Sequence, residues 1–437
     1  MQKNSFYIET YGCTSNKADS YIISDILRKS GYTQTSLDDA QFIIINTCGV
    51  KEQTENKIKA RLEDIHKKFQ NNPKIHTIIA GCLPYIAPNY IKVIQKIIPS
   101  FGAIIDLNNF VDLPEIFQKI SSGKKNLVLK SDKSIDKSKY YVNHLPGKIT
   151  GIIPISEGCL GSCSYCCVKN ARGNLNCYNP KDIIQNINYQ LKQEIKQIYL
   201  TSQDCSIYQY NGTSLADLIK KIVGLDYKFY LRIGMINPQF LINNTKELIS
   251  IFKHKKVYKF LHIPIQSGSN DVLKRMQRKY LISSIINKLE MLRKEFENLT
   301  ISTDIICGFP GETEYDFYRT INFIKWLRPE ILNISKFTPR PGTKAKKMEQ
   351  LGSKIIKERS IRLSRVFRNS LIDINKSWKG WEGEVLILHE GTVQNQAFGR
   401  NFAYKNVFID NYYGEFGTFV KAKIEKVDGF NLFGRVI

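Results

Sequence analysis

Hydrophobic and polar positions along the first 120 residues predict strands and helices in alternation. Short runs rich in β-branched and aromatic residues predict buried strands at 5–10, 42–47, 76–81 and 102–107. Polar segments of helical length separate these runs, at 16–31, 51–69 and 88–97. Repeated strand-helix units predict a parallel sheet with helices on both faces. We therefore expect an N-terminal open parallel α/β domain over residues 1–120.

A second series of the same kind follows a break in the pattern. Residues 121–148 are rich in Lys and Ser, carry few apolar residues and are interpreted as a linker. Beyond it, strand-like runs alternate with segments of helical length, at 150–156, 196–202, 228–234, 259–265, 299–306 and 331–337. Six parallel strands are too few for a complete eight-stranded barrel, so residues 149–343 are predicted to form a partial (β/α)6 barrel.

The last part of the chain changes character twice. Residues 344–379 hold 11 Lys and Arg against 3 acidic residues, which predicts a basic helical connection. In residues 380–437, apolar and polar positions alternate in short runs separated by Gly and Asn. This pattern is typical of a small antiparallel β-barrel, so we expect a third domain there.

Composition and charge predict the cellular compartment of the protein and the class of partner that it binds. The chain has 437 residues, ten cysteines and a net charge of +24, from 64 Lys and Arg against 40 Asp and Glu. No apolar run is long enough to span a membrane and no apolar signal core is found at the N-terminus, so we expect a cytoplasmic protein without membrane contact. In a reducing compartment, cysteines favour metal binding or catalysis over disulfides. The positive charge favours a polyanionic partner.

Three cysteines directly after the first barrel strand form a CxxxCxxC motif, at Cys159, Cys163 and Cys166. Three thiolates on one loop can ligate three irons of a [4Fe-4S] cluster and leave the fourth iron open to a substrate. A structural zinc site is the alternative, but it needs a fourth Cys or His at a paired spacing. Cys167 adjoins the motif and Cys177 lies on a separate segment, so the sequence favours the cluster over zinc.

Three further cysteines, Cys13, Cys48 and Cys82, each follow a predicted strand of the N-terminal domain and precede a predicted helix. The carboxyl ends of parallel strands meet at one edge of a sheet, and helix N-termini there stabilise thiolates. Free cysteines are often simply buried as small hydrophobes. Because three stand at equivalent strand ends, we favour a second three-thiolate [4Fe-4S] cluster.

The CxxxCxxC motif, with Tyr165 before its last cysteine and at the mouth of a six-strand βα series, resembles the radical S-adenosylmethionine superfamily. The two cysteine triads in this order resemble its methylthiotransferases, which have an N-terminal cluster domain, a radical barrel and a C-terminal TRAM domain. Further motifs similar to the family stand at 263–269, 302–313 and 340–343. Segments most similar to the archaeal and eukaryotic tRNA branch stand at 11–20, 50–55 and 399–404.

The resemblance implies that the barrel triad holds a cluster whose open iron binds S-adenosylmethionine, and that the N-terminal triad holds an auxiliary cluster carrying the sulfur to be inserted. One S-adenosylmethionine would yield the radical that removes hydrogen from an aromatic carbon, and another would supply the methyl group. For the tRNA branch, the implied reaction converts N6-threonylcarbamoyladenosine at position 37, beside the anticodon, to its 2-methylthio derivative. The implied partners are the tRNA anticodon stem-loop and an electron donor such as a flavodoxin or ferredoxin.

Polar residues at or near the carboxyl ends of the barrel strands, together with Tyr165, are candidates for contacts with S-adenosylmethionine or substrate. These strand-end residues are Gln203, Arg232, Gln266 and Asp304. They could instead cap strand ends or form salt bridges. His262 is interpreted as a hydrogen-bonded barrel histidine, and the remaining cysteines are interpreted as structural: Cys167, Cys177, Cys205 and Cys307.

Other functions remain open on the sequence alone. One is a methylthiotransferase acting on another tRNA adenosine derivative or on a ribosomal protein side chain. The other is a non-enzymatic iron-sulfur protein that binds RNA. The basic region 344–379 beside a small β-barrel favours RNA, because lysines and arginines neutralise the backbone while exposed rings stack on bases.

Overall fold

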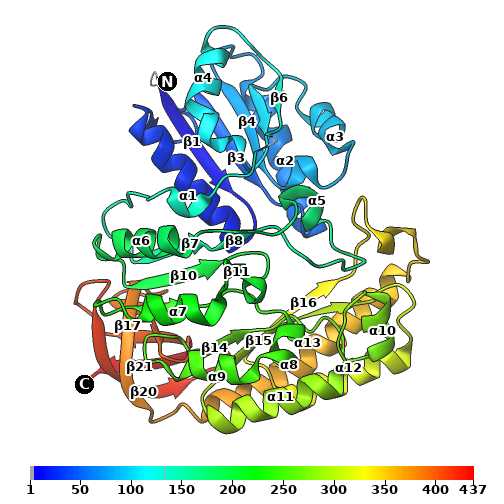
Figure 1. Cartoon of the computed structure of the whole chain (residues 1–437), viewed down its shortest axis with the longest axis vertical. Helices are drawn as coiled ribbons and strands as arrows, with labels where there is room; N and C mark the ends of the chain where they lie inside the picture. Colours follow the sequence, from blue (N-terminus) through cyan, green and yellow to red (C-terminus); the bar gives the residue numbers. More distant parts are fainter. Residues whose placement is uncertain (1–3, 132) are drawn as a thin grey trace. The chain divides into compact units, whose positions relative to one another are not determined.

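The computed structural model describes residues 4–131 and 133–437, and the chain divides into two compact units (Figure 1). Unit 1 contains Met1–His144, Ile152–Asn186 and Thr338–Lys346, and unit 2 contains Leu145–Gly151, Ile187–Phe337 and Lys347–Ile437. The cysteine loop after the first barrel strand therefore belongs to the same unit as the N-terminal domain. Within the described residues, no helix is both long enough and apolar enough to cross a membrane.

A six-stranded parallel sheet forms the centre of unit 1, in the order β2-β1-β3-β4-β5-β6. Its strands are β1 (Ser5–Thr10), β2 (Thr33–Gln34), β3 (Phe42–Thr47), β4 (His76–Gly81), β5 (Ala103–Ile105) and β6 (Leu127–Leu129). The strands predicted at 5–10, 42–47 and 76–81 have the observed bounds. β6 lies within residues 121–148, so part of the segment interpreted as a linker is an edge strand of this sheet.

Helices cover both faces of this sheet because its strands are apolar on both. They are α1 (Thr14–Lys29), α2 (Glu52–Phe69), α3 (Tyr90–Ile97) and α4 (Leu113–Ser121). In β3, Phe42 and Ile44 belong to the core formed with α1 and α4, whereas Ile43 and Ile45 belong to the core formed with α2 and α3. Strands buried on both faces appear in the sequence as continuous apolar runs. The predicted open α/β domain is confirmed.

The barrel strands form two parallel sheets, ordered β7-β10-β13 and β14-β15-β16, and a parallel bridge joins Leu231 to Val257. The strands are β7 (Thr150–Pro154), β10 (Gln197–Thr201), β13 (Tyr230–Arg232), β14 (Phe260–His262), β15 (Thr300–Cys307) and β16 (Ile331–Lys336). The helices of the series are α6 (Pro180–Leu191), α7 (Leu215–Val223), α8 (Pro238–Asn243), α9 (Thr245–Lys253), α10 (Asn270–Arg275), α11 (Ile282–Glu295) and α12 (Glu314–Leu327). Six strands alternating with helices confirm the predicted partial barrel.

A closed five-stranded barrel ends the chain, in the order β17-β18-β19-β21-β20. Its strands are β17 (Glu382–Glu390), β18 (Gln396–Asn401), β19 (Asn406–Asp410), β20 (Phe419–Val427) and β21 (Asn431–Val436). All neighbouring strands are antiparallel except β19 and β21, which are parallel. A closed ring with an odd number of strands must contain such a pair, because strand directions cannot alternate all the way around it. The predicted small barrel is confirmed with this addition.

The basic region before this barrel contains one long helix, α13 (Ser353–Lys376). Its buried side chains recur at helical spacing along one face: Arg359, Leu363, Phe367, Leu371 and Asn375. Arg359 is buried there because its Nη1 lies 2.6 Å from the Glu312 carboxylate, in the turn before α12. A buried cation needs such a partner. One side of α13 is therefore fixed against the partial barrel.

Tyr404 anchors the closed barrel to strands of the partial barrel within unit 2. Its side chain is 9% exposed, and its hydroxyl lies 2.7 Å from the hydroxyl of Tyr199. The rings of Tyr258 and Phe260 lie 5.0 Å and 4.7 Å from its own, centroid to centroid. Aromatic side chains packed in this way bury much of the apolar area at a contact between domains.

Replacing Tyr404 by Ala should lower the free energy of unfolding by about 3 kcal/mol, as truncation of a buried aromatic side chain does. Tyr413→Ala is the matched control, because Tyr413 lies in the same domain but is 78% exposed. The control should change the free energy by less than about 0.5 kcal/mol. Urea unfolding of the full chain measures both, and equal values for the two variants would contradict the anchoring role.

Candidate metal centres

The cysteines of the CxxxCxxC motif lie on a loop between β8 (Ser156–Glu157) and α5 (Val168–Arg172). The backbone N–H of Gly161 donates to Sγ of Cys159 at 3.2 Å. A Cβ added at Gly161 would lie 3.2 Å from Sγ of Cys159 and 3.8 Å from Sγ of Cys163. The two sulfurs therefore flank a glycine whose missing side chain leaves room beside them.

The N-terminal cysteines follow three neighbouring strands of the unit 1 sheet, as the sequence predicted. Cys48 and Cys82 come directly after β3 and β4, and Cys13 is the N-cap of α1. The N–H of Cys82 donates to the carbonyl oxygen of Thr47 at 2.9 Å. A Cβ added at Gly12, which has a φ of +112°, would lie 2.5 Å from Cβ of Cys48. Only glycine therefore allows the loop of Cys13 to come this close to Cys48.

Two of the three thiols of this N-terminal triad have a pKa raised by burial. Cys48 and Cys82 are buried, whereas Cys13 is exposed. Burial raises the pKa of the Cys82 thiol to about 12, and the charge of the Arg172 guanidinium counteracts part of the effect. Burial also raises the pKa of Cys48. Thiols bind metal as thiolates, so iron binding at this triad must release protons.

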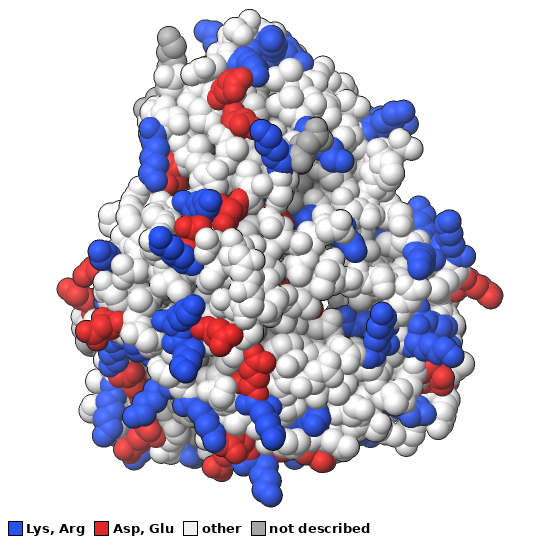
Figure 2. All heavy atoms as spheres, viewed as in Figure 1, with Lys and Arg blue, Asp and Glu red and all other residues white. Residues whose placement is uncertain are grey.

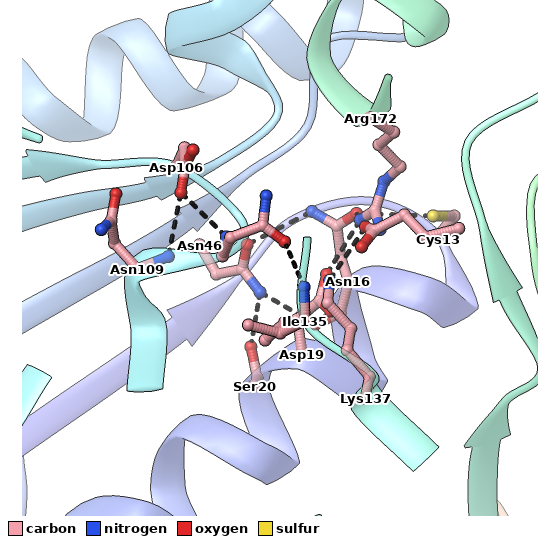
Figure 3. A network of polar contacts seen from close by, with 12 residues as sticks. Cys13, Asn16, Asp19, Ser20, Asn46, Asp106, Asn109, Ile135, Lys137 and Arg172 are labelled. Atoms are coloured by element: carbon pink, nitrogen blue, oxygen red, sulfur yellow. Dashed lines mark hydrogen bonds and ion pairs between the residues drawn. The ribbon is translucent and has the colours of Figure 1, made fainter. Parts of the chain in front are cut away.

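Asn16, in the first turn of α1, links the loops that carry Cys13 and Cys48 of the N-terminal triad (Figure 3). Its Oδ1 accepts a hydrogen bond from Sγ of Cys13 at 3.4 Å and another from Nη2 of Arg172 at 2.9 Å. Its Nδ2 donates to the carbonyl oxygen of Thr47 at 2.7 Å. Thr47 precedes Cys48, so one buried amide side chain fixes both strand ends relative to each other.

Two cations and two carboxylates are buried together beside this triad, and Figure 3 labels three of them, Asp19, Lys137 and Arg172. Arg172 lies 2.9 Å from Asp19 and 2.6 Å from Glu157. Lys137 lies 2.8 Å from Asp19 and 2.9 Å from Glu157. Burial alone would raise the pKa of Asp19, but the charges of Lys137 and Arg172 lower it overall. Each buried charge thus has two partners of opposite sign, which offsets the cost of removing it from water.

A second set of contacts joins the two cysteine loops. Sγ of Cys167 donates to the carbonyl oxygen of Gly49 at 3.3 Å, and Nη2 of Arg340 donates to the same oxygen at 2.7 Å. Arg340 also pairs with Glu55 of α2 at 2.6 Å. Gly49 and Cys167 each directly follow a triad cysteine, so the backbone beside one triad is tied to the backbone beside the other. Cys167 is a core residue here, in agreement with the structural role predicted for it.

The residues predicted to contact S-adenosylmethionine or substrate are divided between the two units. Tyr165 belongs to unit 1, and the other four belong to unit 2: Gln203, Arg232, Gln266 and Asp304. The structure brings two of these together, because the N–H of Gln266 donates to the carbonyl oxygen of Asp304 at 2.8 Å. The Asp304 carboxylate lies 2.9 Å from Nε2 of His262, which is the hydrogen-bonded histidine expected from the sequence.

Arg232, at the end of β13, is surrounded by aromatic rings. Its guanidinium carbon lies 5.0 Å from the ring of Tyr199, 4.8 Å from that of Phe260 and 5.2 Å from that of Tyr404. Cation–π contacts of this kind hold an arginine without consuming its N–H donors. Gln203 lies two residues beyond β10. Contacts of these residues with a cofactor stay predictions.

Asn16, Lys137 and Arg172 are residues of this site that the sequence did not single out. They lie outside the cysteine motifs, and Asp19 and Arg172 are 153 positions apart along the chain. Lys137 stands in the Lys- and Ser-rich segment 121–148, interpreted as a linker. A weak signal for Asn16 and Asp19 was present, since both stand in the segment 11–20 that resembles the family.

The chemistry of both triads fits an iron-sulfur cluster. Among residues 4–131 and 133–437, no three His, Cys, Asp or Glu side chains form a group that could hold a single metal ion. An iron-sulfur cluster does not require three side chains to meet at one metal ion, because each thiolate binds a different iron. Three thiols at each position would supply the ligands, and Arg172 supplies a fixed cation beside the N-terminal triad.

Comparison with protein families identifies two matching segments. Residues 153–324 match the Radical SAM superfamily, and residues 5–101 match the family described as Uncharacterized protein family UPF0004. The first segment contains the CxxxCxxC motif, and the second contains the N-terminal triad. The superfamily match implies S-adenosylmethionine and a [4Fe-4S] cluster as cofactors.

Named relatives are similar over nearly the whole chain. A probable threonylcarbamoyladenosine tRNA methylthiotransferase of Pyrococcus horikoshii is 36% identical over 435 residues, which cover 99% of each chain. The threonylcarbamoyladenosine tRNA methylthiotransferase of Homo sapiens is 32% identical over 432 residues, which cover 96% of this chain and 71% of the human one. Among solved structures, the radical S-adenosylmethionine methyltransferase TsrM from Kitasatospora setae has a similar fold, with a TM-score of 0.56 at 11% identity over 77% of this chain and 75% of that chain. From its near full-length identity to these relatives, the chain belongs to the family of threonylcarbamoyladenosine tRNA methylthiotransferases within the radical SAM superfamily.

Proposed function

We propose that this protein converts N6-threonylcarbamoyladenosine at position 37 of tRNA to its 2-methylthio derivative. The observation that carries the proposal is the presence of two cysteine triads in one compact unit, joined by the hydrogen bonds of Arg172 and Arg340. The names of the relatives supply the substrate. A radical enzyme with a single cluster has no need of a second cysteine triad.

The chain's own residues have separate tasks in this reaction. Cys159, Cys163 and Cys166 would hold the cluster that binds S-adenosylmethionine, and the N-terminal triad would hold the auxiliary cluster. When bound, these groups supply hydrogen abstraction, sulfur and a methyl group. Burial of Cys48 and Cys82 keeps water away from two of the three auxiliary ligands, and Asn16 fixes the Cys13 thiol.

Unit 2 would bind the tRNA. The outer face of α13 exposes five cations: Lys354, Lys357, Arg365, Arg368 and Lys376. Large aromatic side chains are exposed on the closed barrel: Tyr413, Phe416 and Phe430. Lys and Arg outnumber Asp and Glu over the face of the molecule drawn in Figure 2. Cations along a helix neutralise phosphates and exposed rings stack on bases, a combination suited to an RNA loop.

Nucleoside analysis tests the activity directly. Reconstituted protein, incubated anaerobically with S-adenosylmethionine, a chemical reductant and tRNA carrying N6-threonylcarbamoyladenosine, should yield the 2-methylthio nucleoside by mass spectrometry. The same tRNA with unmodified adenosine at position 37 should remain unchanged. Product only on another adenosine derivative, or only on a ribosomal protein, would replace the substrate proposed here. Cluster-loaded protein that makes no 5′-deoxyadenosine would overturn the enzymatic function.

Single cysteine variants separate the two clusters. Cys82→Ala should lose roughly half of the bound iron yet still cleave S-adenosylmethionine, because the other triad is intact. Cys163→Ala should lose cleavage. Cys205→Ala is the matched control, since this cysteine is fully buried and lies outside both triads, and it should retain both properties. Undiminished iron content in the Cys82→Ala variant would contradict the auxiliary cluster.

Charge reversal on α13 tests the tRNA surface. The double variant Arg365→Glu and Arg368→Glu should bind tRNA roughly tenfold more weakly and with a shallower salt dependence, because fewer counterions are released. The control Lys57→Glu and Lys67→Glu makes the same change of charge at exposed positions of α2. Filter binding at several salt concentrations measures both. Equal losses in the two variants would show that only net charge matters.

A further inference from the structure

Arg172 links both ends of the CxxxCxxC loop to the helix that follows Cys13. It ends α5, the helix that follows the CxxxCxxC loop. Its Nη1 donates to Glu157, two residues before Cys159, at 2.6 Å. Its Nη2 donates to Asn16 and to Asp19 of α1, at 2.9 Å each. The loop of one triad is thereby closed at both ends and fixed to the helix that follows Cys13.

The same guanidinium acts on the thiols of the N-terminal triad. Its charge acts against burial and lowers the pKa of the Cys82 thiol. Asn16 extends the contact to Cys13, because its Oδ1 accepts from both Arg172 and Sγ of Cys13. Arg172 is 3% exposed in its side chain, so water does not screen its charge from these sulfurs.

Because Lys137 pairs with the same two carboxylates, these carboxylates do not neutralise Arg172 alone, and its charge can act on the N-terminal triad. Asp19 and Glu157 are each paired with both cations, so the four buried charges sum to zero. Removing the arginine charge leaves one uncompensated carboxylate beside three thiolates. Removing the Asp19 charge has the opposite effect and leaves one uncompensated cation.

We propose that Arg172 is a positioning residue that couples the two cysteine sites and raises the reduction potential of the cluster held by Cys13, Cys48 and Cys82. Reduction adds one electron to a cluster, and a fixed, desolvated cation near the ligand sulfurs stabilises the added negative charge. The inference rests on the proposed function, because it requires the auxiliary cluster.

The two charges of the network give variants with opposite expected effects. Arg172→Gln keeps a hydrogen-bonding group but removes the cation, so it should lower the midpoint potential of the auxiliary cluster. Asp19→Asn removes a carboxylate and should raise it. The double variant Arg172→Gln with Asp19→Asn restores a neutral network and should return the potential towards that of the parent. A purely structural disturbance would not produce opposite shifts and mutual compensation.

The measurement is a redox titration of the full chain followed by electron paramagnetic resonance. Replacing Cys159, Cys163 and Cys166 by Ala leaves the N-terminal triad as the source of the signal, and the variants are made in this background. Arg359→Gln is the matched control, since it removes a buried, ion-paired arginine of unit 2. The control should lose stability without shifting the potential.

The outcomes distinguish a failure of this proposal from a failure of the proposed function on which it rests. A background protein that binds no iron overturns the two-cluster function and the proposal with it. Iron-loaded protein whose potential is the same with Arg172→Gln as without it overturns the role of Arg172 and leaves the function standing. If Arg172→Gln fails to load iron, Asp19→Asn decides: a raised potential supports the proposal, and an unchanged one overturns it.

Discussion

Unit 1 depends on the mutual neutralisation of four charges that no longer contact water. Arg172, Lys137, Asp19 and Glu157 have side chains at most 7% exposed, and each lies within 3 Å of two partners of opposite charge. Any one of them buried alone would cost several kcal/mol, so the four must be buried together. They come from α1, the segment after β6, β8 and α5. Their pairing therefore fixes four separate stretches of chain at once.

The parallel sheet determines where the thiols of the N-terminal triad can lie. β1, β3 and β4 are neighbours in the sheet and run in the same direction, so their carboxyl ends and the cysteines that follow them share one edge. Apolar cores on both faces make this edge rigid. Asn16 and Thr47 then fix the loops by hydrogen bonds, and Gly12 permits the close approach of Cys13 and Cys48.

In unit 2, one side of the C-terminal region packs against the partial barrel while the other faces solvent. Tyr404 is packed among the rings of Tyr199, Tyr258 and Phe260, and Arg359 is buried against Glu312. The opposite face of α13 keeps its cations in solvent. Strong positive charge therefore does not prevent the basic helix from packing, because the arginine on its inner face is neutralised locally.

The sequence by itself determined most of the strands and helices and named the candidate ligands. Periodicity placed β1, β3 and β4 to the residue, and strand-end position identified the cysteines, because both signals are local and repeat along the chain. β6, the parallel pair of β19 and β21, and the role of Lys137 depended on the tertiary structure. So did the contact between Asp19 and Arg172, which are 153 positions apart. From the sequence alone, a charged residue is expected to lie in solvent. Only the folded chain shows that a partner of opposite charge has been brought close enough to keep it buried.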